Sequence, residues 1–122
     1  MHPTPRDRRA ELGARGEQIA VDHLTAAGFV VLDRNWRSGR GELDVVARDG
    51  DALVFCEVKT RSGTGFGDPA EAVTPAKQAR LKQLAGAWLD QHDERSARLR
   101  FDVVGVLVLG GRVDVQHLRG AF

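Results

Sequence analysis

The segment from residue 41 to residue 61 places charged side chains inside two apolar runs. An Asp-Gly pair at 49–50 separates the runs, and this pair between apolar, β-branched stretches is typical of a β-hairpin. Asp44 interrupts the first run, Glu57 interrupts the second, and Lys59 follows closely. Such groups are rarely buried in a sheet unless they are paired or bind a metal ion. Any fold of this chain must therefore give these three groups partners.

Strand alternation indicates which of these groups meet. Successive side chains point to opposite faces of a strand, so Glu42 shares a face with Asp44, and Glu57 shares one with Lys59. If the hairpin register makes these faces coincide, carboxylates and an amine converge. Neighbouring carboxylates suit Mg²⁺, and an ammonium beside them can orient water and stabilise charge on a phosphoryl group. The alternative is a structural ion pair between Lys59 and one acid at the end of a strand.

The spacing of these groups resembles the PD-(D/E)XK nuclease superfamily. Asp44 matches the first acid of that superfamily, and residues 57–59 match its Glu-x-Lys element, 13 positions later. Leu43 stands where the superfamily often has proline. A longer ordered set of motifs resembles the small bacterial YraN-like family over roughly residues 10 to 118. The set comprises Gly16-Glu17, Arg34-Asn35-Trp36-Arg37, Gly41-Glu42-Leu43-Asp44, Phe55 to Arg61, Phe66-Gly67 and Ala72-Val73.

The YraN-like family is described as endonuclease-like and similar to archaeal Holliday-junction resolvases. The resemblance implies a restriction-endonuclease-like core in which Asp44, Glu57 and the Val58 carbonyl bind Mg²⁺ or Mn²⁺. It implies that Lys59 orients the attacking water and that Glu17 completes the metal site from the first helix. From the residues alone, Glu17 is equally a solvated helix residue.

Polar and basic side chains flank the hairpin. The candidate contacts to nucleic acid are Arg37, Arg40, Thr60 and Arg61. Arginine beside a metal site can hold a phosphate, and a solvent-exposed turn with incidental charge is the alternative. Glu42 is a candidate supporting acid, and the glycine-rich segment 62–67 predicts a mobile loop beside the site. The following helix carries further cations that either contact DNA or form a solvated face: Lys77, Arg80 and Lys82.

The whole chain predicts the element order α-β-β-β-α-β-β. Apolar stripes at helical spacing, with Gly28 as a stop and Thr74-Pro75 as a start, predict two helices. The predicted boundaries are a flexible tail at 1–9, helices at 10–27 and 74–91, and strands at 29–36, 43–47, 52–58, 99–109 and 112–118. A helix that crosses between strands indicates an α/β fold with a central mixed β-sheet of about five strands flanked by helices. We expect residues 10–122 to form one domain.

Composition narrows the function classes. The 122 residues, 42% of them hydrophobic, suffice for one packed core. The single cysteine, Cys56, has no internal disulfide partner and is expected in the core on the face opposite Glu57. No apolar run reaches the roughly 18 residues of a membrane span, and no signal peptide is visible, so we expect a cytoplasmic location. With 18 basic and 17 acidic residues, a DNA-binding surface requires local segregation of charge.

These patterns predict a metal-dependent DNA endonuclease that hydrolyses phosphodiester bonds. By resemblance, its substrate is branched or recombination DNA, and cutting both strands would favour a homodimer. A chain of this size has no separate specificity domain, so phosphate contacts are expected to dominate over base readout. Two alternatives keep the fold without the chemistry: a non-catalytic DNA-binding accessory, and an adaptor in DNA processing that binds an unknown protein partner. Asp102, which also interrupts an apolar strand, is expected to be a strand-end or hydrogen-bonded acid, and a supporting role is the alternative.

Overall fold

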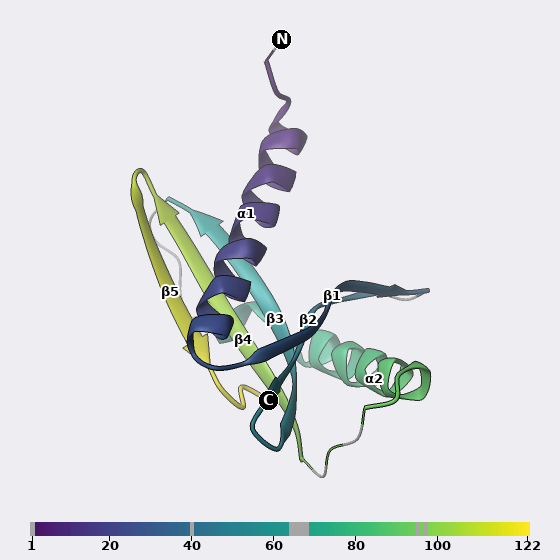
Figure 1. Ribbon diagram of the computed structural model, residues 1–122. Helices are drawn as coiled ribbons and strands as arrows, with labels where there is room; N and C mark the ends of the chain where they lie inside the picture. Colours follow the sequence, from purple (N-terminus) through teal and green to yellow (C-terminus); the bar gives the residue numbers. More distant parts are fainter. Residues whose placement is uncertain (1, 40, 64–68, 95, 97) are drawn as a thin grey trace.

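The computed structural model describes residues 2–39, 41–63, 69–94, 96 and 98–122. Within them, a mixed sheet of five strands carries one helix on each face (Figure 1). The elements are α1 (Pro5–Ala26), β1 (Val30–Ser38), β2 (Gly41–Asp49), β3 (Ala52–Ser62), the 3-10 helix η1 (Pro69–Ala72), α2 (Pro75–Gln91), β4 (Arg98–Leu109) and β5 (Arg112–Leu118). This order and this sheet confirm the predicted α/β fold.

The strands lie in the sheet in the order in which they follow along the chain. β1, β2 and β3 form an antiparallel meander, and β4 and β5 form a second antiparallel pair. β3 and β4 are parallel. After β3 the chain must therefore return to the end of the sheet where β3 began before it can form β4, and α2 makes that crossover. The central β3 therefore has a helix above and below it, which explains why its first seven residues are all buried.

Two apolar clusters fill the space between the sheet and its helices. On the α1 face, Ala20 and Leu24 pack with side chains of β2, β3 and β4 that include Cys56. On the α2 face, the stripe that includes Trp88 packs with the alternate side chains, such as Phe55. Cys56 thus lies in the core on the face away from Glu57, as predicted, and Trp88 is only 1% exposed. The Trp88 indole donates a hydrogen bond to Asp33 of β1 at 2.9 Å, which ties α2 to the meander.

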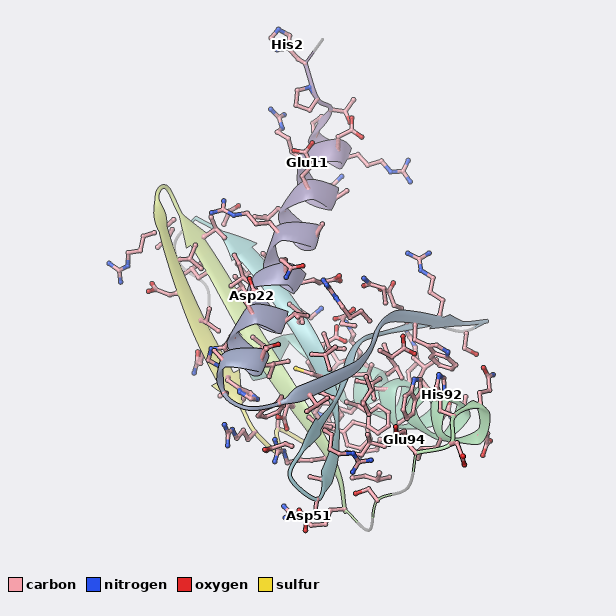
Figure 2. The ribbon with its side chains drawn as sticks, in the orientation of Figure 1. His2, Glu11, Asp22, Asp51, His92 and Glu94 are labelled. Atoms are coloured by element: carbon pink, nitrogen blue, oxygen red, sulfur yellow. The ribbon has the colours of Figure 1, made fainter. Side chains whose placement is uncertain are left out.

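The first helix begins earlier than the apolar stripe predicts. Residues 5–9, which were assigned to the tail, form its first turns, because Thr4 caps the helix and Pro5 starts it. The Thr4 hydroxyl accepts the Asp7 N–H at 3.1 Å, and the Asp7 carboxylate accepts the Thr4 N–H at 3.1 Å. These turns project beyond the sheet and their side chains are exposed, so no apolar stripe marks them (Figures 1 and 2).

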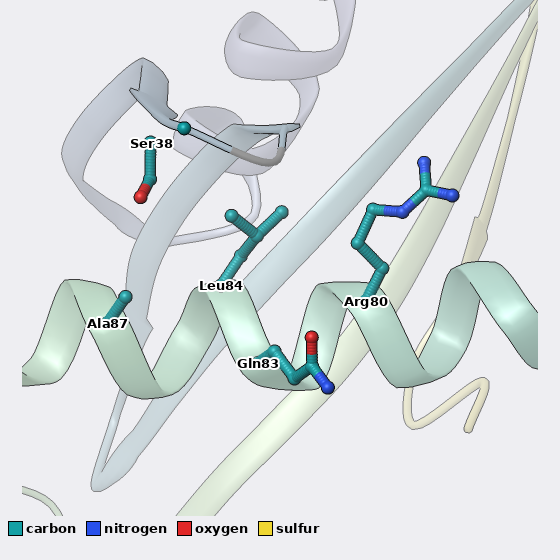
Figure 3. Close-up of a pocket in the computed structure, with 6 residues that line it drawn as sticks. Ser38, Arg80, Gln83, Leu84 and Ala87 are labelled. Atoms are coloured by element: carbon teal, nitrogen blue, oxygen red, sulfur yellow. The ribbon is translucent and has the colours of Figure 1, made fainter.

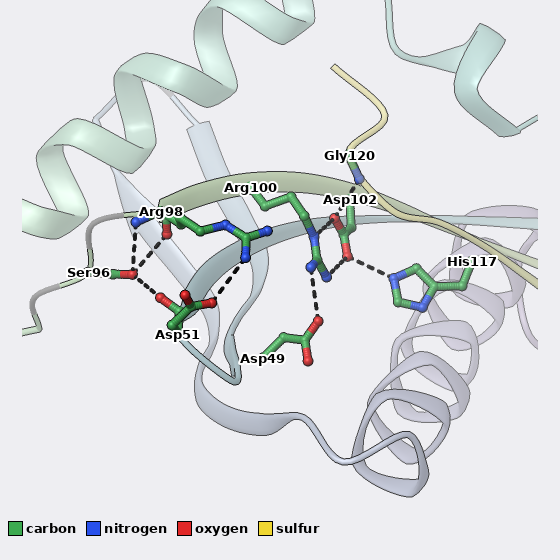
Figure 4. Close-up of polar contacts among 8 residues, drawn as sticks. All are labelled: Asp49, Asp51, Ser96, Arg98, Arg100, Asp102, His117 and Gly120. Atoms are coloured by element: carbon green, nitrogen blue, oxygen red, sulfur yellow. Dashed lines mark hydrogen bonds and ion pairs between the residues drawn. The ribbon is translucent and has the colours of Figure 1, made fainter.

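A buried ionic network joins β4 to β5, to the segment after β5 and to the end of β2 (Figure 4). Asp102 of β4 is fully buried and accepts hydrogen bonds from Arg100 at 2.8 and 2.9 Å and from the Gly120 N–H at 3.0 Å. His117 of β5 lies 2.8 Å from the same carboxylate, and Arg100 also pairs with Asp49 at 2.9 Å. Asp102 is therefore the hydrogen-bonded acid that its sequence context predicts. In the part of the chain that the structure describes, no helix is long and apolar enough to cross a bilayer.

Candidate active site

The site lies where β2 and β3 separate. Their ladder runs from the Asp49–Ala52 pair to the Val45–Cys56 pair and ends there. Asp44 is the next residue of β2, and in this register it stands opposite Glu57. The Asp44 carboxylate accepts the Val58 N–H at 2.9 Å, so a side chain takes the place of a main-chain acceptor. The Val58 N–H thus has a hydrogen-bond partner at the point where the two strands separate, and the same bond fixes the position of the Asp44 side chain.

Three carboxylates from two elements meet at this opening. One oxygen from each of Glu17, Glu42 and Asp44 lies within 4.8 Å of the others. Glu17 comes from α1, and it reaches the site because α1 approaches β3 closely at Gly16. A Cβ at Gly16 would overlap the Thr60 side chain, so only glycine permits this approach. The cluster is therefore built by helix packing as well as by the hairpin.

Burial and crowding disfavour negative charge in this cluster. Burial raises the pKa of Asp44 to about 7, and the neighbouring charge of Glu57 acts in the same direction. The hydrogen bond from Val58 opposes this shift but does not cancel it. Burial and the charge of Glu42 likewise raise the pKa of Glu17. An excess of carboxylate in a confined space is the arrangement that a bound divalent cation would relieve.

Glu57 is paired with lysines. Its carboxylate is 6% exposed and lies 2.6 Å from the Lys77 ammonium of α2 and 3.7 Å from that of Lys59. Burial lowers the pKa of Lys59, and the adjacent Lys77 lowers it further. Lys77 is better compensated: burial acts to lower its pKa, but hydrogen bonds to Glu57 and Lys59 outweigh burial and raise it. Lys77 therefore keeps its proton, while Lys59 is the lysine that gives one up more easily.

The acids and lysines open into a hollow of about 200 Å³. Its walls come from the start of β2, from β3 and from the first turns of α2. The lining residues are Gly41, Glu42, Asp44, Glu57, Lys77, Arg80, Leu81 and Leu84. Charged groups of both signs thus face one confined space whose base is the apolar α2 side of the sheet.

A family model matches residues 16–106, a span that contains all of these acids and lysines. Its description is "Uncharacterised protein family UPF0102". The chain belongs to this family. A UPF0102 protein of Frankia alni is 57% identical over 112 residues, which are 91% of this chain and 93% of the relative. One of Mycolicibacterium vanbaalenii is 53% identical over 118 residues, which are 96% of this chain and 98% of the relative.

UPF0102 is the YraN-like family, and its fold is restriction-endonuclease-like, so both parts of the sequence resemblance are confirmed. A UPF0102 protein of Rhodococcus opacus is 51% identical over 91% of this chain and 95% of its own length. Because the chain and these relatives cover almost the whole of each other, the likeness includes both helices and the whole sheet.

The structure brings the core residues predicted from the sequence together. Asp44, Glu57 and Lys59 converge where the hairpin opens, and Glu17 joins them from α1. Glu42, predicted as a supporting acid, lies in the tight three-carboxylate group. Glu57 is directed at the lysines instead, although it still raises the pKa of Asp44.

The predicted nucleic-acid contacts are more dispersed. Arg37 pairs with Glu42 at 3.5 Å, and its side chain is 81% exposed. Thr60 lies against Gly16 in the contact between α1 and β3, and Arg61 is exposed near the end of β3. Arg40 and most of the predicted glycine-rich loop lie outside the described residues.

Sequence reasoning missed two residues of the site in this UPF0102 protein. A solvated face was one prediction for Lys77, and it is wrong because Lys77 is bound to Glu57. The signal was present, because Lys77 precedes Leu81 by four residues and so continues the buried stripe of α2 by one turn.

The second missed residue is Asn35 of β1. It has a left-handed backbone with φ of 53°, and its side chain forms a hydrogen bond with Glu17 that acts to lower the pKa of that acid. Asparagine tolerates this conformation better than most residues, but the neighbouring residues do not predict a left-handed backbone at this position.

Proposed function

We propose that this UPF0102 protein is a metal-dependent DNA endonuclease that hydrolyses phosphodiester bonds. The observation that carries the proposal is the group of three carboxylates beside a buried Glu57–lysine pair, in one hollow of a restriction-endonuclease-like fold. Carboxylates and amines from distant parts of the chain meet at this point. Burial and the charge of Glu57 raise the pKa of Asp44, and burial and the adjacent Lys77 lower that of Lys59. Perturbed acids and bases in a hollow are typical of catalytic sites.

The donor set fits Mg²⁺ or Mn²⁺. All three grouped ligands are carboxylate oxygens, which hard divalent cations prefer over sulfur or imidazole ligands. Asp44, Glu17 and Glu42 would hold the ion, and the family resemblance adds Glu57 and the Val58 carbonyl. When bound, such an ion polarises a phosphoryl oxygen and makes coordinated water more acidic.

The protein's own residues have distinct tasks in this proposal. Lys59, with its lowered pKa, orients the attacking water and exchanges a proton with it. Lys77 keeps its positive charge, holds Glu57 in place and faces the charge that develops on the phosphoryl group. The hydrogen bond from Val58 fixes Asp44 before substrate arrives.

The proposed substrate is DNA, at branched or recombination structures by family resemblance. Exposed arginines at the rim, Arg37 and Arg61, would contact phosphates near the site. A homodimer would present two such sites to two strands.

The test is cleavage of end-labelled duplex, single-stranded, flap and four-way-junction DNA in Mg²⁺, Mn²⁺ or EDTA. Cutting should need metal and should disappear in Glu57→Ala and Lys59→Ala, while Glu11→Ala, an exposed acid on the projecting part of α1, should cut like the wild type (Figure 2). Cutting that persists in both site variants would point to a contaminant and refute the assignment.

One observation favours a non-catalytic alternative. Glu57 is already neutralised by Lys77 at 2.6 Å, as in a structural ion network. In a DNA-binding accessory or a protein–protein adaptor, this network would only hold α2 against the sheet. Calorimetric titration with Mn²⁺ separates the two: the endonuclease needs a saturable site that is lost in Asp44→Asn, whereas the adaptor needs none.

A further inference from the structure

A second hollow continues the acidic site along α2 (Figure 3). It has a volume of about 440 Å³ and is lined by Ser38, Gly39, Arg80, Gln83, Leu84 and Ala87. Arg80 and Leu84 also line the hollow that contains the carboxylates. The two spaces therefore meet at one turn of α2, and an extended ligand can occupy both.

The second space lies between one side of α2 and the end of β1. Arg80, Gln83, Leu84 and Ala87 follow one side of α2 at helical spacing, and they face the end of β1 across the hollow. A Cβ at Gly41 would lie 3.2 Å from a Leu84 methyl carbon and 3.6 Å from the Arg80 side chain. A larger residue at Gly41 would therefore crowd Arg80 and Leu84, the two residues that line both hollows.

The lining suits a nucleotide. The Arg80 guanidinium makes no ion pair with any residue that the structure describes, whereas Lys77, one turn earlier, is bound to Glu57. An arginine without an acidic partner can bind a phosphate through two parallel N–H bonds. Beyond it, the half-buried Ala87 and the edge of Leu84, a residue only 4% exposed, form an apolar floor, and the Gln83 amide adds a polar contact. The volume falls in the range of roughly 300–1,000 Å³ that is usual for ligand sites.

We propose that this second hollow binds the nucleotide next to the scissile phosphodiester, a role that rests on the proposed nuclease function. Arg80 holds the phosphate at the junction of the two hollows, and the base packs against Leu84 and Ala87. Because an apolar surface accepts the face of any base, this subsite positions the strand without strong sequence preference. Residues of α2 therefore position the DNA strand, and they are separate from the carboxylates.

The test follows isotope-labelled protein by NMR during titration with tetrathymidylate in Ca²⁺, which takes the same oxygen ligands as Mg²⁺. Backbone amides of Gly39, Gln83 and Ala87 should shift, and Arg80→Ala should weaken the Kd about tenfold through loss of the charge-assisted bonds. Lys82→Ala removes a cation from the other side of the same helix and should leave the Kd unchanged. Shifts confined to other surfaces, or equal loss in both variants, would overturn the subsite.

A second variant tests the base itself. Ala87→Leu adds volume where the base would lie and should weaken tetrathymidylate binding about tenfold, because the larger side chain overpacks that space. The same variant should bind an abasic tetranucleotide like the wild type, since that probe carries no base to exclude. Equal effects of Ala87→Leu on both probes would refute the base-binding role.

The two proposals fail separately. If Arg80→Ala and Ala87→Leu bind like the wild type while metal-dependent cutting is lost in Glu57→Ala, the subsite is wrong and the nuclease stands. If the probe-specific losses occur but no DNA is cut, the hollow binds a nucleotide, but the nuclease proposal is wrong and with it the placement beside a scissile phosphodiester.

Discussion

Asp44 occupies a position that disfavours the ionised form of its carboxylate. It is largely buried, it stands opposite Glu57, and Glu17 and Glu42 crowd it from the other side. A raised pKa means that the folded protein binds a proton here that the unfolded chain has already lost at neutral pH. The ionised carboxylate that the proposed metal site requires therefore costs stability in the metal-free protein.

The pH dependence of stability should show this cost. The pKa of Asp44 rises from 3.8 to about 7, so the native state holds more protons than the unfolded state across that window, and stability falls as pH rises through it. Between pH 6 and pH 8, the loss should be about 1.4 kcal/mol. Urea denaturation in EDTA measures it.

Asp44→Asn should make that pH profile shallower and raise the stability at pH 8, because an amide oxygen can still accept the Val58 N–H without a charge. Asp90→Asn, at an exposed position on α2, is the matched control and should leave the profile unchanged. A wild-type slope retained in Asp44→Asn would show that the carboxylate is not the titrating group.

Asn35 carries a backbone cost of its own. Its φ of 53° is unfavourable for residues with a Cβ, by about 1–2 kcal/mol. Asn35→Gly should relieve the backbone and lose only the hydrogen bond to Glu17, whereas Asn35→Ala should lose the bond and keep the strain. Asn35→Ala should therefore be less stable than Asn35→Gly by about 1 kcal/mol in urea denaturation. Equal stabilities would mean that the left-handed turn is not what selects asparagine.

At the scale of elements, the contact between α1 and β3 decides whether Glu17 reaches the site. Gly16 allows the helix to lie against Thr60, and Glu17 is the next residue. The helix position and the acid position are therefore one property of the fold.

Two glycines of α1 give a matched test. Gly16→Ala should destabilise the protein by about 1–3 kcal/mol and lower metal affinity, because the added Cβ pushes α1 away from Thr60. Gly13→Ala meets nothing within 4 Å and should stabilise the protein by about 0.5–1 kcal/mol through helix propensity. Thermal unfolding and Mn²⁺ calorimetry measure both. A stabilising Gly16→Ala would contradict the close approach.

On the scale of the whole molecule, the Asp102 network holds several elements together at a place away from the candidate site. It links β4 to β5 through His117, to the chain end through Gly120 and to the hairpin through Arg100 and Asp49 (Figure 4). Burial acts to raise the pKa of Asp102, but the bonds from His117 and Arg100 outweigh it and lower the pKa to about 2. The ionised carboxylate thus stabilises the fold.

Acid should unfold the protein partly through this residue. A folded-state pKa of about 2 against 3.8 gives stability that is present above the unfolded value and is lost progressively as pH falls from about 5 to about 1, to the extent of about 2.5 kcal/mol. Asp102→Asn should flatten the pH dependence of stability in this range and cost about 3 kcal/mol at pH 7, because it leaves Arg100 with Asp49 as its remaining anionic partner. Asp114→Asn, an exposed acid on β5, should change neither. If Asp102→Asn loses stability at low pH as the wild type does, other carboxylates are responsible for acid unfolding.

The sequence by itself determined the elements, their order and the hairpin that opposes Asp44 to Glu57. These properties depend on period-two alternation and on the Asp-Gly turn, and both act over a few residues. The first turns of α1 escaped this reasoning because they make no core contact, so their start is set by a cap instead of an apolar stripe.

Only the tertiary structure decided which groups complete the site. Glu17 and Lys77 lie on different helices, and each reaches the opening because its helix docks on the sheet at one depth and rotation. Docking depends on residues far apart in the chain, such as Gly16 against Thr60. The local hydrophobic periodicity of the sequence therefore does not predict it. The left-handed backbone of Asn35 inside β1 is likewise not recorded in any local period. The hairpin chemistry is therefore local, whereas the assembly of acids and lysines around it is a consequence of packing.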